Sequence, residues 1–158
     1  MALTLYQTLI QSHFDYCSTI WMNGYSIHLS RLQVIQNRAL RIVLQVDNRF
    51  NRQTLYRTLK VDCLVDRWNK QALLLIFKLL NNLLPKTLCA RLKKRESNYS
   101  LRNYDNIISL PRPKSNILKN STLYSASKLL HYLPQGIRTI HSLYAFSKAI
   151  SDLSFVPH

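Results

Sequence analysis

Apolar residues of the first 85 positions recur at helical spacing in four stretches. The first stretch stops at Gly24, a residue typical of helix C-termini, and its apolar side chains recur every three to five positions. These side chains are Leu5, Leu9, Phe14, Cys17 and Trp21. The pattern predicts a helix that buries this stripe, and we expect Trp21 and Trp68 in the core.

The second stretch has the most regular helical pattern. Its apolar residues fall at steps of three and four: Leu32, Ile35, Ala39, Ile42 and Val46. Arg31, Arg38 and Arg41 lie away from that stripe. The pattern predicts an amphipathic helix in which the apolar stripe faces the core and the arginines line one side, away from that stripe.

Two further helices are predicted before residue 85. A short one covers residues 53–60, and a longer one begins near Leu64. Asp62 and Asp66 flank this start, where carboxylates offset the positive end of the helix dipole. Pro85 blocks any continuation.

The periodicity is lost over residues 86–120. Charged residues crowd positions 91–96, and Pro111 and Pro113 force their neighbours to be extended. We expect an irregular basic loop with a short strand near residues 107–110. Two helices follow, over 123–133 and 142–153, separated by Pro134-Gln135-Gly136, with Ser142 as the N-cap of the second.

The pattern therefore predicts an all-α protein, a small multi-helix bundle with a long irregular basic loop in its second half. Residues 1–85 form a helical core of about four helices, residues 86–120 form the Pro-containing loop, and residues 121–158 form two helices that pack on the core. Only two glycines are present, which argues against glycine-rich nucleotide-binding loops.

The net charge of +15 is unevenly distributed. Residues 1–30 contain no Lys or Arg, whereas residues 31–70 and 86–119 have net charges of +6 and +7. Such blocks neutralise phosphates, although an anionic membrane surface could also attract them.

The basic loop is the strongest candidate for a nucleic-acid site, because cations alternate there with tyrosines that can stack on bases. A solvated linker is the alternative, as a solvated polar face is for the arginines of the second helix. The candidate residues are Arg31, Arg38, Arg41, Lys93, Lys94, Arg95, Tyr99, Arg102, Tyr104, Arg112, Lys114 and Lys119.

Catalytic and metal sites are not expected. His13 and Cys17 have a metal-ligand spacing but no third ligand nearby in the sequence, and the position of Asp62 and Asp66 at a helix start explains them without chemistry. We expect no cofactor and no metal.

The three cysteines form no C-x-x-C pair, which suits reduced thiols, and no signal peptide or membrane span is visible. We expect a soluble intracellular protein that binds no membrane.

Four segments in register resemble non-LTR (LINE-type, Jockey-like) retrotransposon reverse transcriptases, in the region that follows the polymerase palm. They are Tyr6–Trp21, Leu32–Arg41, Leu110–Lys114 and the stretch from Leu123 to Lys148. Leu130-His131-Tyr132 departs from the Trp-Asn of that family. The Y-x-D-D aspartates of the palm are absent, and Tyr104-Asp105-Asn106 is the nearest look-alike. The resemblance implies the thumb and post-palm tail without its enzyme.

Three functions stay open at this point. The first is a non-catalytic reverse-transcriptase fragment that binds the RNA or DNA backbone without sequence preference, located in the nucleus if functional. The second is a helical interaction module that docks on a reverse-transcriptase palm domain, and apolar residues 1–30 suit such an interface. The third is a transposon relic with no selected function.

Overall fold

The computed structural model describes residues 1–22, 26–92, 108–109, 112–151 and 153. Every regular element in these ranges is a helix, which confirms the predicted all-α class. Contacts divide the chain into two compact units, one containing Met1–Trp68 and one that starts at Asn69. The division into residues 1–85, 86–120 and 121–158 stays a prediction.

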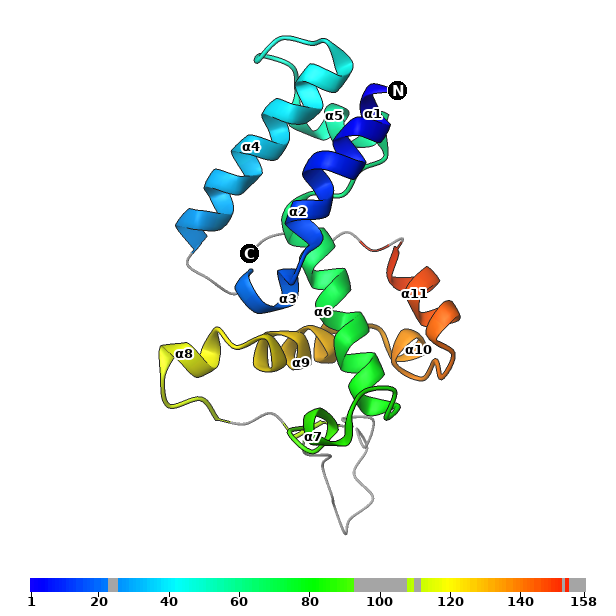
Figure 1. The fold of residues 1–158 in the computed structure, drawn as a ribbon. Coiled ribbons are helices and arrows are strands. Elements are labelled where there is room, and N and C mark those ends of the chain that lie inside the picture. The colour runs from blue at the N-terminus through cyan, green and yellow to red at the C-terminus, as the bar shows by residue number, and fades with distance from the viewer. Residues whose placement is uncertain (23–25, 93–107, 110–111, 152, 154–158) are drawn as a thin grey trace. The chain divides into compact units, whose positions relative to one another are not determined.

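The N-terminal segment is a helix of mixed type. It comprises α1 (Ala2–Leu5), the π-helix η1 (Tyr6–Gln11) and α2 (Ser12–Asp15), and α3 (Ser18–Trp21) follows a break (Figure 1). The hydroxyl of Ser12 donates to the Thr8 carbonyl at 2.6 Å, a back-bond that disturbs regular α-helix. Cys17 takes a left-handed conformation with φ 50° and separates α2 from α3.

The buried side of this segment differs from the predicted stripe. Leu5, Leu9 and Trp21 are 54%, 63% and 36% exposed, and Cys17 is exposed as well. The buried residues are Tyr6, Phe14, Ser18 and Met22. Hydrogen bonds of a π-helix span five residues instead of four, so η1 shifts the helical phase on which the prediction depended. The predicted stop at Gly24 lies outside the described residues.

The next three helices are α4 (Ser26–Leu44), α5 (Arg52–Leu59) and α6 (Leu64–Leu80). The Asn51 side chain accepts the Gln53 amide hydrogen at 2.9 Å and caps α5, and left-handed Lys60 ends it. These helices confirm the two elements predicted over residues 53–60 and from Leu64.

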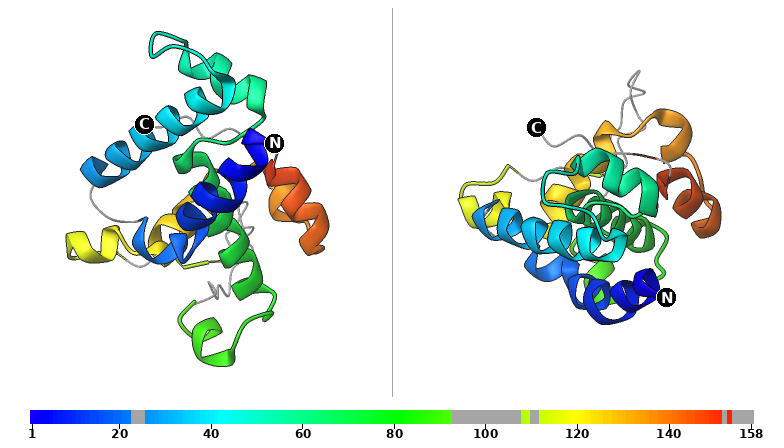
Figure 2. Two further views of the ribbon diagram at one scale, coloured as in Figure 1. Left: turned by 45° about the horizontal axis from the view of Figure 1, so that its top comes forward. Right: turned by 90° about the horizontal axis from the view of Figure 1, so that it is seen from above.

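The first unit is built around two apolar clusters. Tyr6, Leu40, Leu55 and Val61 form one cluster where α4 packs against η1 and α5 (Figures 1 and 2). The other contains Phe14, Met22 and Leu64, and half-buried Trp68 packs against it. The clusters hold α4 from one side.

The second unit contains the later part of α6 and five further helices among its described residues. They are α7 (Lys86–Cys89), α8 (Asn116–Lys119), α9 (Thr122–Tyr132), α10 (Gln135–Arg138) and α11 (Leu143–Ser151). Phe77 of α6 and Phe146 of α11 stack with ring centroids 4.4 Å apart in the core.

Both C-terminal helices predicted from the sequence are confirmed as α9 and α11. Two details were wrong: α7 and α8 form inside the predicted irregular loop, and α10 begins at Gln135, within the predicted break. Of the strand expected near residues 107–110, the structure describes Ile108, which has an isolated bridge pairing, and the irregular Ser109.

Candidate nucleic-acid interface

The exposed face of α4 carries the predicted arginines together with apolar side chains. Arg31 and Arg38 are exposed and seven residues apart, so they lie within about 20° of each other around the helix. Arg41 follows one turn later, and its half-buried guanidinium has a buried Nε with no hydrogen-bond partner. We call these three residues the arginine row.

The apolar stripe predicted for this helix lies only partly in the core. Leu32, Ala39 and Val46 are half-buried and pack against the two clusters, whereas Ile35 and Ile42 are 50% and 76% exposed. Val34 is 48% exposed and lies with these isoleucines on the same face as the arginine row. The buried face is the opposite one, where Gln36, Asn37 and Leu40 are all at most 5% exposed. The prediction is wrong for Ile35 and Ile42 because amides, rather than branched aliphatic residues, fill much of this buried face.

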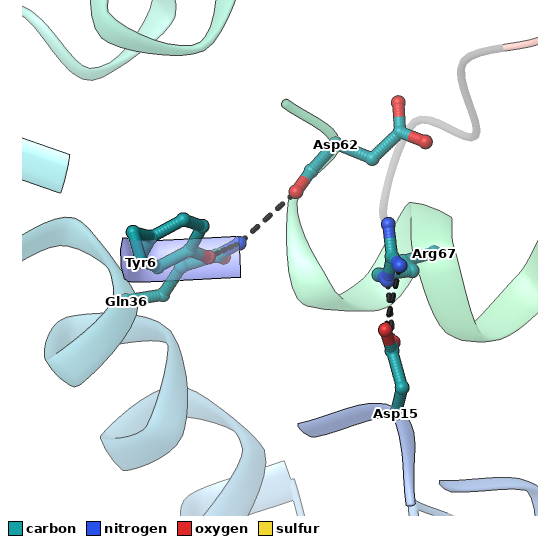
Figure 3. A network of polar contacts seen from close by, with 5 residues as sticks. All are labelled: Tyr6, Asp15, Gln36, Asp62 and Arg67. Carbon is teal, nitrogen blue, oxygen red and sulfur yellow. Dashed lines mark hydrogen bonds and ion pairs between the residues drawn. The ribbon is translucent and has the colours of Figure 1, made fainter. Parts of the chain in front are cut away.

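Gln36 is the centre of that buried face. Its Nε2 donates to the Tyr6 hydroxyl at 3.1 Å and to the Asp62 carbonyl oxygen at 3.0 Å (Figure 3). Its Oε1 accepts from Gln33 Nε2 at 2.7 Å. One side chain thereby ties α4 to η1 and to the segment between α5 and α6.

Gln33 and Asn37 extend the network toward α5. Gln33 Nε2 donates to the Tyr56 hydroxyl at 2.5 Å, and its Oε1 accepts the Leu64 amide hydrogen at 3.0 Å. The Tyr56 hydroxyl donates to Asn37 Oδ1. Because these bonds are directional, they fix the rotation of α4 about its axis and so fix where the arginine row points.

An ion pair links α2 to α6 beside this network. Arg67 donates through Nε to Asp15 Oδ1 at 2.5 Å and through Nη2 to Asp15 Oδ2 at 2.6 Å (Figure 3). The hydrogen bond to Asp15 raises the pKa of the Arg67 guanidinium. This bidentate geometry is among the stronger forms of ion pair.

Burial changes the ionisation of three groups near the network. It raises the pKa of the Tyr6 and Tyr56 hydroxyls and raises the pKa of the Cys63 thiol to about 11. The three groups are therefore protonated at neutral pH, and their environment gives no sign of an activated nucleophile.

The described part of the predicted basic loop contains five exposed cations, of which three were predicted site residues: Arg112, Lys114 and Lys119. Arg112 lines a cavity together with Arg91, which was not among the predicted site residues. The other predicted members lie outside the described residues: Lys93, Lys94, Arg95, Tyr99, Arg102 and Tyr104. The arginine row and the basic loop belong to different units, so the structure unites three of the predicted residues in one row.

Sequence reasoning missed the amide network because glutamine and asparagine are ordinarily read as solvent-facing. A signal was present: Gln33, Gln36, Asn37 and Leu40 recur at steps of three, one and three, which places them on one helix face. The residues outside α4 that hydrogen-bond to the three amide side chains lie 19 to 31 positions away in the sequence.

No group of three His, Cys, Asp or Glu side chains in the described ranges could hold a metal ion. Cys17, Cys63 and Cys89 are free thiols. None of the described helices is long and apolar enough to span a membrane.

Comparisons with known proteins gave a similarity that covers part of the chain. No family model and no solved structure matches it. A stretch of 70 residues, 44% of the chain, is 30% identical to the probable RNA-directed DNA polymerase from transposon X-element of Drosophila melanogaster, of which the chain spans 8%. Over that stretch, the chain is similar to a transposon-encoded polymerase, and this supports a relationship to the retrotransposon reverse transcriptases.

Proposed function

We propose that this chain is a non-catalytic C-terminal part of a retrotransposon reverse transcriptase that binds the phosphate backbone of RNA or DNA without sequence preference. The arginine row is the observation that carries the proposal. It lies on one face of α4, and no acidic residue occurs between Arg31 and Asp47. Cations held on a rigid helix can contact successive phosphates, and the polymerase to which the chain is similar acts on nucleic acid.

The charge of the second unit supports the same partner. Its described residues include ten lysines and arginines and no Asp or Glu. The cations are Lys70, Lys78, Lys86, Arg91, Arg112, Lys114, Lys119, Lys128, Arg138 and Lys148. A field of one sign attracts polyanions over distances of about 10 Å at moderate salt.

A salt titration of binding tests the proposal. Fluorescence anisotropy of a labelled single strand, measured between about 50 and about 200 mM salt, should give a slope of log K against log salt of about −3 to −4 if four to six phosphates are contacted. The double variant Arg31→Gln/Arg38→Gln should make the slope less negative by about 1.5.

The matched control removes two other exposed cations of the same unit, Arg49 and Arg57, which lie outside α4. We expect Arg49→Gln/Arg57→Gln to leave the slope near that of the unmodified chain. Absence of binding at low salt would refute the proposal. If both double variants changed the slope by the same amount, the arginine row would not be the binding surface.

We propose docking on a polymerase palm domain as a second candidate function, and a separate observation suggests it. Leu5, Leu9, Tyr16 and Ile20 are 54% to 77% exposed in a segment without Lys or Arg. Exposed apolar residues that are grouped in this way mark protein interfaces. In this assignment the palm supplies the catalytic carboxylates and this chain supplies a helical surface.

Co-purification tests the docking function. A tagged reverse-transcriptase palm domain expressed with this chain should retain it, and Leu9→Ser/Ile20→Ser should abolish retention. Leu83→Ser/Ile117→Ser is the control, because both residues are exposed and belong to the second unit. Equal retention of all three chains would exclude the N-terminal segment as the interface.

A further inference from the structure

A cavity of about 190 Å³ lies in the second unit, where the end of α7 meets α8 and α9. Two arginines from distant positions, Arg91 and Arg112, line it together with apolar side chains. Ser121, the N-cap of α9, and Tyr124 and Ser127 of that helix also line it. The Ser121 hydroxyl donates to the Leu118 carbonyl at 2.8 Å. The cavity thus places two cations at the edge of a wall that is otherwise largely apolar.

The described residues that line the cavity include two arginines and no carboxylate. Both arginines are exposed. A guanidinium binds phosphate through two parallel hydrogen bonds, which gives the contact geometric selectivity as well as charge.

The start of α9 adds to the positive potential. This helix has 11 residues, and the Ser121 hydroxyl caps it by accepting the Tyr124 amide hydrogen at 3.4 Å. Since Ser121 and Tyr124 both line the cavity, the positive end of the helix dipole lies at its wall. Ser127, about one turn further along, is 3% exposed and also lines the cavity.

We propose that this cavity binds the terminal phosphate of a nucleic-acid strand. The proposal rests on the proposed function, since it assigns the strand end to a site apart from the arginine row. A terminal phosphate carries close to two negative charges at neutral pH, which two guanidinium groups match. An internal phosphodiester carries one charge and continues as chain on both sides, so a cavity accommodates a strand end more readily.

The test compares two labelled oligonucleotides of about 12 nucleotides, identical except that one carries a 5′-phosphate. We expect the unmodified chain to bind the phosphorylated strand about tenfold more tightly, as one charge-assisted contact predicts. Arg91→Gln/Arg112→Gln should lose this preference. The control Lys86→Gln/Lys148→Gln, which removes two exposed cations of the same unit that do not line the cavity, should keep it.

The outcomes separate this proposal from the proposed function. Equal binding of both strands by the unmodified chain, or an unchanged preference in Arg91→Gln/Arg112→Gln, overturns the phosphate site while backbone binding stands. If neither strand binds, the proposed function fails. Binding of inorganic phosphate then tests the phosphate site by itself. At ionic strength matched with chloride, phosphate should raise the melting temperature of the unmodified chain and of the control, but not of Arg91→Gln/Arg112→Gln; no such rise overturns the proposal.

Discussion

Replacing Gln36 by leucine should destabilise the first unit although the side chain becomes more apolar. Gln36 is 1% exposed and makes four hydrogen bonds, so Gln36→Leu removes partners from the buried Tyr6 hydroxyl and from the half-buried Asp62 carbonyl. Gln33 keeps its bonds to Tyr56 and Leu64, whereas the Tyr6 hydroxyl and the Asp62 carbonyl each lose the bond from Gln36.

The magnitude follows from those two lost bonds. A buried polar group left without a partner costs about 1–3 kcal/mol, so Gln36→Leu should lower the free energy of unfolding by about 2–6 kcal/mol. That is a large part of the stability of an ordinary domain, about 5–15 kcal/mol. An exposed glutamine provides the control: Gln53→Leu on α5 should change the stability by less than about 0.5 kcal/mol.

A double-mutant cycle with Tyr6→Phe isolates the mechanism. Once the Tyr6 hydroxyl is absent, Gln36→Leu leaves one fewer group unpaired, so the double variant should cost about 1 kcal/mol less than the sum of the single variants. Urea unfolding followed by tryptophan fluorescence measures all four proteins, because Trp21 and Trp68 both belong to the first unit. Additivity within about 0.3 kcal/mol would refute the reasoning.

Three further predictions concern the ion pair, the second core and alkaline pH. Asp15→Asn should cost about 1 kcal/mol in urea unfolding, since the pair with Arg67 is bidentate but about 30% exposed, and the loss should shrink at high salt. Phe146→Ala should lower the free energy of unfolding by about 3–5 kcal/mol, measured by thermal unfolding followed by circular dichroism. A loss below about 1.5 kcal/mol, the range typical of Ile→Val substitutions, would contradict the stacked packing of Phe146 on Phe77. Because folding raises the pKa of Cys63 to about 11 and also raises that of Tyr56, stability is retained below their unfolded pKa values and should fall as the pH rises from about 9 to 11. Cys63→Ala/Tyr56→Phe should flatten that fall, and an unchanged pH profile would argue against it.

The sequence predicted those helices whose signals are local. α5 has a capping asparagine before it, and α9 is followed closely by Pro134. The orientation of α4 could not be predicted in this way, because its buried amides depend on Tyr6, Tyr56 and Asp62, which are far away in the sequence. Periodicity ranks Ile42 above Gln36 as a core residue, and tertiary hydrogen bonds reverse that order.

The two candidate sites also differ in whether local sequence signals could predict them. Arg31 and Arg38 could be grouped from the sequence because helical spacing alone brings them together. The cavity of Arg91 and Arg112 could not, since these residues are separated by 20 intervening positions and meet through the packing of α7, α8 and α9. Helical periodicity offers no rule that pairs them.

The buried amides of α4 also bear on how its surface can change during evolution. Apolar contacts tolerate a small turn or slide of a helix, whereas a set of hydrogen bonds to several fixed partners permits a single rotational setting. Substitutions at exposed Val34 or Ile35 can therefore alter what the helix contacts without turning it. A substitution at Gln33 that left α4 folded but rotated would misdirect the arginine row. Affinity for a ligand could then be lost with every basic residue still in place.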